Sequence, residues 1–92
     1  MHETGIVRDL IRRIEQAAAD AGATRVSAVS VRIGALSEFS PVHFREHFGE
    51  EAGGTLAEGA VLHLEVSDNI LDPHAQGVAI EDITLEAPDK GG

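Results

Sequence analysis

The sequence has no cysteine, no tryptophan and no tyrosine, and its only aromatic side chains are three phenylalanines. Without cysteine the chain forms no disulfide bond and none of the structural zinc sites that thiolates build. No apolar run approaches the roughly 20 residues of a membrane-spanning helix. The first residues are not a basic segment followed by an apolar run, so we expect no signal peptide. We therefore expect a cytoplasmic protein that makes no membrane contact.

Basic residues are also scarce. Seven Lys and Arg side chains face 16 Asp and Glu side chains, which gives a formal net charge of −9. Such a surface repels phosphate backbones, so we expect no nucleic acid partner. It attracts metal cations and basic protein surfaces, although the same charge can serve only to keep a small domain in solution. The 92 residues suffice for one domain with a modest core.

The first third of the chain predicts a helix and then a strand. Apolar residues recur at spacings of three and four from about residue 4 to residue 21, which is the pattern of an amphipathic helix. Thr4 is the expected N-cap, and Gly22 is the expected stop. A strand is expected over residues 25–33, because apolar and polar residues alternate there, as in Val29, Ser30, Val31, Arg32 and Ile33.

The rest of the chain predicts one more helix and two more strands. Ser40 is the expected cap of the second helix and Pro41 its first residue. We expect the apolar contacts of this helix from Val42, Phe44, Phe48 and Ala52. The second strand should present Ala60, Leu62, Leu64 and Val66 on one face. In the third strand, residues 78–86, the apolar phase changes, which predicts a bulge near Glu81–Asp82.

This order predicts the α+β class: a small mixed three-stranded sheet with two helices on one face, in α-β-α-β-β order. The helical crossover favours parallel pairing of the first two strands, and the short link favours antiparallel pairing of the second with the third. Residues 1–86 should form a single α/β domain, with a link at 67–77 and a polar tail at 87–92. The uncovered face should carry Ser30, Arg32, Val61, His63 and Glu65.

The start of the chain, Met1-His2-Glu3, offers nitrogen donors at a spacing that chelates metal. The α-amine of Met1 and the amide nitrogen of His2 close a five-membered ring around an ion. That amide and the Nδ1 atom of His2 close a six-membered ring. Ionised amide ligands suit square-planar Ni(II) or Cu(II) and do not suit Zn(II). Glu3, through its carboxylate or its amide, or a water can complete the site, and Met1 should be retained because His2 is large.

Three motifs add a family resemblance. The stretches MHETGIVRDLIRRIE, RIGALSEFSP and GGTLAEGAVLHLE, in this order and spacing, resemble the HypA/HybF family, the accessory proteins that deliver nickel during [NiFe]-hydrogenase maturation. The resemblance covers residues 1–66 and 77–86. It implies that Met1, His2 and Glu3 form the nickel-binding terminus.

The chain departs from that family in two places. Family members carry a zinc domain with two CxxC pairs between the second and third strands, whereas this chain has SDNILDPHAQG there and no cysteine. We therefore expect no zinc. The family also usually has an acidic residue before the proline of the second helix, where this chain has Ser40. A further candidate nickel ligand is thus missing. Glu38 lies two residues before Ser40, but nothing in the sequence shows that it replaces the missing acid.

Four other histidines are weaker metal candidates. His43 and His47 lie four residues apart on the second helix and share a face, but no third ligand is evident. His63 should point outward from the second strand, and His74 has only Asp72 near it in sequence. No nucleophile–base pair, glycine-rich phosphate loop or catalytic motif is present, so we do not expect an enzyme.

Two functions fit these observations. The first is a nickel metallochaperone that holds Ni(II) at its amino terminus and delivers it to a hydrogenase large-subunit precursor, alone or with other maturation factors. The second is a docking or scaffold subunit that descends from the same family and binds no metal. Both predict a protein partner that binds near the amino terminus and a sheet edge. Both are also compatible with a homo-oligomer.

Overall fold

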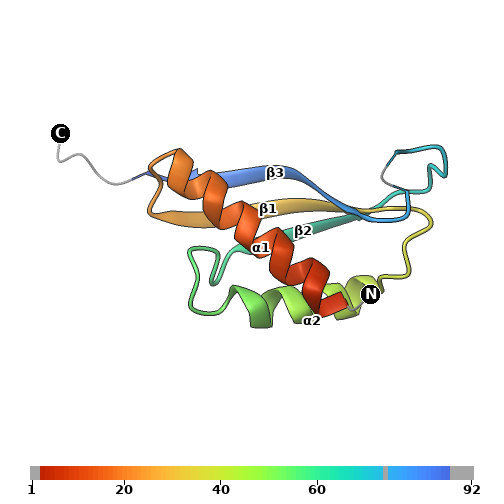
Figure 1. Ribbon diagram of the computed structural model, residues 1–92, viewed down its shortest axis with the longest axis horizontal. Helices are drawn as coiled ribbons and strands as arrows, with labels where there is room; N and C mark the ends of the chain where they lie inside the picture. Colours follow the sequence, from red (N-terminus) through yellow and green to blue (C-terminus); the bar gives the residue numbers. More distant parts are fainter. Residues whose placement is uncertain (1–2, 74, 88–92) are drawn as a thin grey trace.

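A computed structural model describes residues 3–73 and 75–87 of the chain. Within them the chain forms two helices and three strands in the order α1, β1, α2, β2, β3 (Figure 1). Their bounds are Glu3–Asp20 for α1, Arg25–Ile33 for β1, Pro41–Ala52 for α2, Val61–Val66 for β2 and Val78–Glu86 for β3. The order and the α+β class agree with the sequence prediction.

The central strand of the sheet is β1. The strand order is β2-β1-β3, with β2 parallel and β3 antiparallel to β1. The parallel pair was predicted correctly, but the expected pairing of the second strand with the third was wrong. The eleven-residue link is long enough to carry the chain across β1 to its far side, where β3 completes the pairing of the more apolar central strand.

Two irregularities shape the pairing of β1 with β3. The register shifts between Ser30 and Val31, whose partners are Asp82 and Ile80, so Glu81 is an extra residue. This confirms the bulge predicted near Glu81–Asp82. A second shift makes Ser27 the extra residue on β1, and it was not predicted. Ser27 compensates in part, because its hydroxyl donates to the Thr84 carbonyl at 3.3 Å.

One face of the sheet and both helices enclose a single core. Val29, Val31 and Ile33 of β1 are each only 1% exposed, and α1 and α2 pack against them. The core residues of α1 are Val7, Leu10, Ile11, Ile14 and Ala18, and those of α2 are Phe44, Phe48 and Ala52. Val42 was wrongly expected among them: it is 68% exposed, because it lies on the outer side of the first turn of α2.

The opposite face of the sheet is polar, as predicted. Ser30 lies beside His63, and Arg32 beside Glu65, in the register of β1 with β2. Val61, paired with Ala28, is on the same face and is 55% exposed. Neither α1 nor α2 in the described part of the chain is long and apolar enough to cross a membrane.

The end of α1 follows its prediction, and its start does not. Gly22 adopts a φ of 71°, and its N–H donates to the Ala19 carbonyl at 3.0 Å. Ala23 then donates to the Ala18 carbonyl at 2.9 Å, which completes a Schellman motif. Thr4 is not the N-cap, because α1 already begins at Glu3.

The positive φ of Gly22 yields a stability prediction. Gly22→Ala should lower the free energy of unfolding by about 1–2 kcal/mol, because an L side chain is strained in this conformation. Gly49→Ala is the matched control: Gly49 is exposed inside α2 with open space around its missing Cβ. It should raise stability by about 0.5–1 kcal/mol. Urea unfolding measures both, and equal effects of the two substitutions would contradict this account of the turn.

Candidate metal site and its surroundings

The predicted nickel ligands lie at the very start of the fold. Met1 and His2 are outside the described residues, and Glu3 is the first residue of α1. The first N–H groups of a helix have no carbonyl acceptor one turn earlier. The Glu3 amide is therefore not used by the helix, and it can serve as a donor atom once it is deprotonated.

Packing fixes the helix that carries this terminus. Val7 is fully buried and Leu10 is 4% exposed, so the first turns of α1 are held against the core. Arg8 also links α1 to the end of α2, because its Nε donates to Glu51 Oε1 at 3.0 Å. This hydrogen bond, more than the charge of Arg8, holds the pKa of Glu51 below its ordinary value. The described part of α1 is thus held against the core from Val7 onward.

The other histidines do not assemble a site in the structure. His43 is exposed on α2, and His47 has only Glu50 near it, with 3.8 Å between Nδ1 and Oε1. His63 is exposed on the polar face of the sheet, as predicted. His74 lies outside the described residues. Across residues 3–73 and 75–87, no group of three or more His, Asp or Glu side chains could hold a metal ion.

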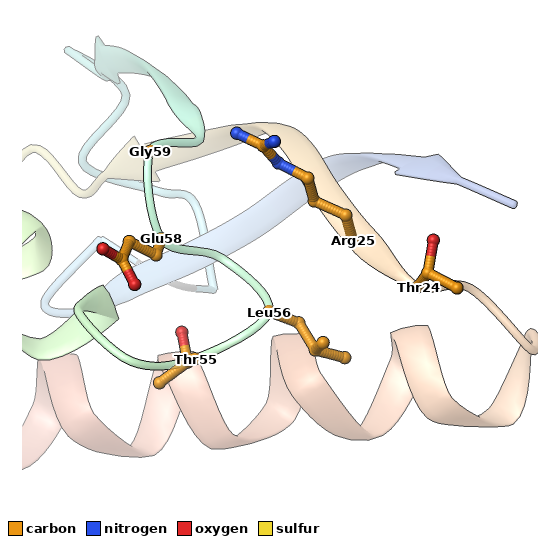
Figure 2. Close-up of a pocket in the computed structure, with 6 residues that line it drawn as sticks. All are labelled: Thr24, Arg25, Thr55, Leu56, Glu58 and Gly59. Atoms are coloured by element: carbon orange, nitrogen blue, oxygen red, sulfur yellow. The ribbon is translucent and has the colours of Figure 1, made fainter. Parts of the chain in front are cut away.

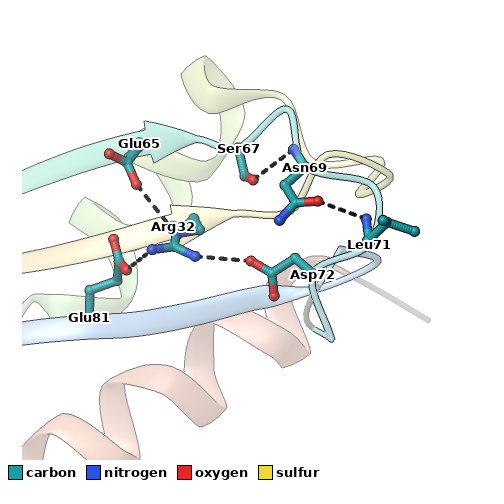
Figure 3. A network of polar contacts seen from close by, with 7 residues as sticks. All are labelled: Arg32, Glu65, Ser67, Asn69, Leu71, Asp72 and Glu81. Atoms are coloured by element: carbon teal, nitrogen blue, oxygen red, sulfur yellow. Dashed lines mark hydrogen bonds and ion pairs between the residues drawn. The ribbon is translucent and has the colours of Figure 1, made fainter.

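Sequence reasoning missed a cluster of charges around Arg32, in the middle of the polar face. Its guanidinium donates to Asp72 at 2.9 Å and also bonds to Glu81 (Figure 3). Glu65 lies 3.3 Å from Arg32 Nε, but that buried nitrogen makes no well-aligned hydrogen bond. The hydrogen bond to Asp72 and then the charge of Glu81 raise the pKa of Arg32 above its ordinary value.

The Arg32 cluster anchors the link between β2 and β3, residues 67–77. The Asp72 side chain is only 10% exposed, and Ala75 is buried. Main-chain bonds hold the same segment to the end of β1, from Leu36 N–H to Ala75 at 2.6 Å and from Gly34 N–H to Gly77 at 2.8 Å. The motif RIGALSEFSP therefore forms the hydrogen bonds that hold the link to the end of β1. These contacts join residues about 40 positions apart in the chain, so no local sequence pattern predicts them.

The link does not fit a structural zinc ion. Such sites are built mainly from thiolates and imidazoles, and this chain has no cysteine. Asp72, one of the carboxylates in the link, is already bonded to Arg32. Asn69 accepts the Leu71 N–H at 3.0 Å, and Ser67 accepts the Asn69 N–H at 3.1 Å, so these side chains stabilise turns.

The motif GGTLAEG forms a closed connection from α2 to β2. Glu58 accepts the Gly54 N–H at 2.9 Å, and the Leu56 carbonyl accepts the Val26 N–H at 2.9 Å. Figure 2 shows the guanidinium of Arg25 on the side of Gly59, with the Glu58 carboxylate directed away from it. An open hollow of about 500 Å³ lies between this loop and Arg25. The motif has a structural role in shaping the connection.

Comparisons with known proteins agree with this fold. The structure is similar to the solution structure of the Ni metallochaperone HypA from Helicobacter pylori, with a TM-score of 0.81 and 20% identity. The match covers 96% of this chain and 100% of the other, and at this identity it shows the fold alone. Residues 1–84 match the family model described as hydrogenase/urease nickel incorporation, metallochaperone, hypA. The chain belongs to the HypA family.

Curated relatives support the same family. Each is named hydrogenase maturation factor HypA: one from Nitrosospira multiformis is 38% identical over 65 residues, and one from Chloroflexus aurantiacus is 42% identical over 65 residues. A third, from Salmonella typhimurium, is 45% identical over 67 residues. Each match covers 71% of this chain but only 55–57% of the relative. The chain therefore spans little more than half the length of the curated relatives it matches.

The contact between Arg32 and Asp72 can be tested directly. Asp72→Asn keeps the size of the side chain and removes its charge, so the link should open more often. Amide hydrogen exchange at Leu36 and Gly34 should become several-fold faster, because their acceptors lie in the link. Glu65→Gln is the matched control, since Glu65 is exposed and makes no aligned bond to Arg32. Unchanged exchange in Asp72→Asn would show that the main-chain bonds hold the link alone.

Proposed function

We propose that this protein is a nickel carrier that binds Ni(II) at Met1, His2 and Glu3 and transfers it to a protein partner in the cytoplasm. The observation that carries this proposal is the family match, which runs from residue 1 to residue 84 and so includes these donors. The rigid start of α1 supports it, because the donors converge with little loss of chain entropy.

The chemistry of the terminus favours nickel over zinc. One α-amine, one or two ionised amides and one imidazole nitrogen make a square-planar field, which Ni(II) accepts and Zn(II) does not. The positive end of the α1 dipole repels a cation. Deprotonation of the amides removes donor hydrogens and adds negative charge at the same place, so metal binding and proton release are coupled. Binding and transfer need no catalytic residue, and we propose that the protein is not an enzyme.

The partner should be a hydrogenase large-subunit precursor or another maturation factor. The relatives named hydrogenase maturation factor HypA support this assignment. A docking subunit that binds no metal is the second candidate, and the complete lack of cysteine favours it, because the CxxC pairs expected from the resemblance are absent. Nickel titration separates the two candidates.

The His2 side chain provides the sharpest test. His2→Ala should abolish stoichiometric nickel binding by the untagged protein, because it removes the imidazole from both the donor set and the six-membered ring. Circular dichroism should stay unchanged, since the core contacts of the described part of α1 begin at Val7. Isothermal titration and the d–d absorption of square-planar Ni(II) give the readout. Unchanged nickel affinity in His2→Ala would leave the docking subunit as the function.

Two controls sharpen this experiment. His43→Ala should bind nickel as the parent protein does, because His43 is exposed and has no metal-binding cluster around it. Protein acetylated at the α-amine of Met1 should lose the spectrum while keeping every side chain, because an acetylated amine is no longer a metal donor. Affinity should also fall as the pH drops, since the α-amine and the amides must lose their protons to bind the metal.

Zinc should play no part in folding. The purified protein should contain no stoichiometric zinc, and a chelator should leave its melting temperature unchanged, because the chain has no thiolate and the Asp72 carboxylate in the link is bonded to Arg32. Metal analysis and thermal unfolding with and without chelator check this. A chelator-sensitive melt with near-stoichiometric zinc would refute it.

A further inference from the structure

The outer edge of β2 is open at its carboxyl end. Ser67 N–H donates to the Ile33 carbonyl at 2.9 Å, so its main-chain groups face β1. Main-chain groups alternate along a strand, and those of Leu62, Leu64 and Val66 therefore face away from β1. Arg45 of α2 donates to the Leu62 carbonyl at 2.9 Å, which agrees with this direction. Among the described residues, Leu64 and Val66 have no strand partner on that side.

An apolar hollow adjoins these two residues. It has a volume of about 420 Å³ and is lined by Pro41, Val42, Arg45, Glu46, Leu64 and Val66. Val42 is 68% exposed and Val66 is 57% exposed, which is unusual for valines that gather around one hollow. Figure 1 shows β2 on the side of the sheet that faces α2. Unpaired main-chain groups and an apolar hollow together are what a docked strand requires.

The opposite edge of the sheet is less suited to a docked strand. The extra residue Glu81 interrupts β3, and such bulges protect edges from pairing. The hollow on that side is smaller, about 290 Å³, and is lined by residues of β3 and α1. By contrast, β2 pairs with β1 in unbroken register from Val61 to Val66.

Charge identifies the kind of partner. Residues 1–35 carry five arginines and four carboxylates, a balance of +1. Residues 36–68, which include α2 and β2, carry one arginine and seven carboxylates, a balance of −6. A second copy of the chain would meet this half with like charge, whereas a basic segment would be attracted. Glu51 and Glu65 of this half already pair with Arg8 and Arg32, so the acidic residues that remain to attract a basic segment are Glu38, Glu46, Glu50, Glu58 and Asp68.

We propose that the edge of β2 at Leu64 and Val66 binds an extended, basic segment of a partner protein as a fourth strand. An apolar side chain of that segment fills the hollow beside Val42, and its basic side chains face the carboxylates around α2. The inference rests on the proposed transfer of nickel to a protein, of which it specifies the contact. It does not require nickel to be bound.

A synthetic heptapeptide of alternating lysine and valine with blocked ends is the probe. It is titrated into the nickel-free full chain, followed by NMR of the main-chain amides and by amide hydrogen exchange. The Leu64 and Val66 amides should shift and become protected, and added salt should weaken binding. Because no nickel is present, failure of the proposed metal site would leave this result untouched.

Two valine variants of β2 make the test specific. Val66→Lys should weaken peptide binding about tenfold, because it places a cation in the hollow and repels the basic segment. Val61→Lys is the matched control: Val61 is 55% exposed on the same strand but lies on the polar face, outside the hollow. It should change the affinity by less than about twofold, since it adds the same charge farther away.

Several results would overturn the proposal. One is a peptide that leaves the Leu64 and Val66 amides unperturbed or perturbs the β3 edge instead. Equal binding of a glutamate–valine peptide would refute the part played by charge. Sedimentation of the free chain as a dimer, with protected Leu64 and Val66 amides, would assign the edge to a second copy. Equal loss of binding in both valine variants would refute the role of the hollow.

Discussion

The central place of β1 determines the rest of this fold. It pairs with β2 on one side and with β3 on the other, so every strand of the described sheet is bonded to it. Its apolar residues Val29, Val31 and Ile33 form the floor of the core, which both helices cover. Its polar residues Ser30 and Arg32 lie on the opposite, uncovered face, where Arg32 pairs with carboxylates. A change that moved β1 by one residue would exchange these two faces.

Arg32 shows what the polar side of β1 does. It is one of only seven basic residues, and it brings together carboxylates from β2, β3 and the link. In a chain with a net charge of −9, a single guanidinium offsets repulsion between acids that the fold places side by side. Asp72 is the most buried of these carboxylates, and its bond ties to the sheet the short link that we expected in place of a zinc domain.

Local patterns predicted the elements but not all of their pairing. The spacing of apolar residues identified both helices, and the change of phase in residues 78–86 identified the bulge at Glu81, because these signals lie within one segment. The partner of β3 depends on a competition between β1 and β2 that the length of a link does not settle. The bulge at Ser27 carries a similar change of phase, because Val26 and Val29 are both buried and lie three residues apart, but the sequence prediction considered only the alternation from Val29 onward. Arg32 and Asp72 are 40 residues apart in the chain, so no local residue spacing predicted their contact.

The candidate metal donors were predicted from the sequence, and the fold adds the electrostatic surroundings of α1. The start of α1 presents unpaired N–H groups and the positive end of a dipole, which alone disfavours a dication. Two features of the chain offset this. Ionised amides would turn the same N–H groups into anionic donors, and α2, which packs against α1, lies in the acidic part of the sequence.

The helix α2 therefore connects the two proposed activities. On one side it is tied to α1 through Glu51 and Arg8, and on the other it contacts the edge of β2 through Arg45 and Leu62. A basic segment docked at that edge would neutralise carboxylates of α2 and reduce their attraction for a metal ion at the start of α1. Docking would then lower the affinity for nickel at the moment of contact. By the reciprocity of coupled binding, bound nickel would weaken docking by the same factor. A carrier with this coupling releases its ion to a bound partner and retains it in solution.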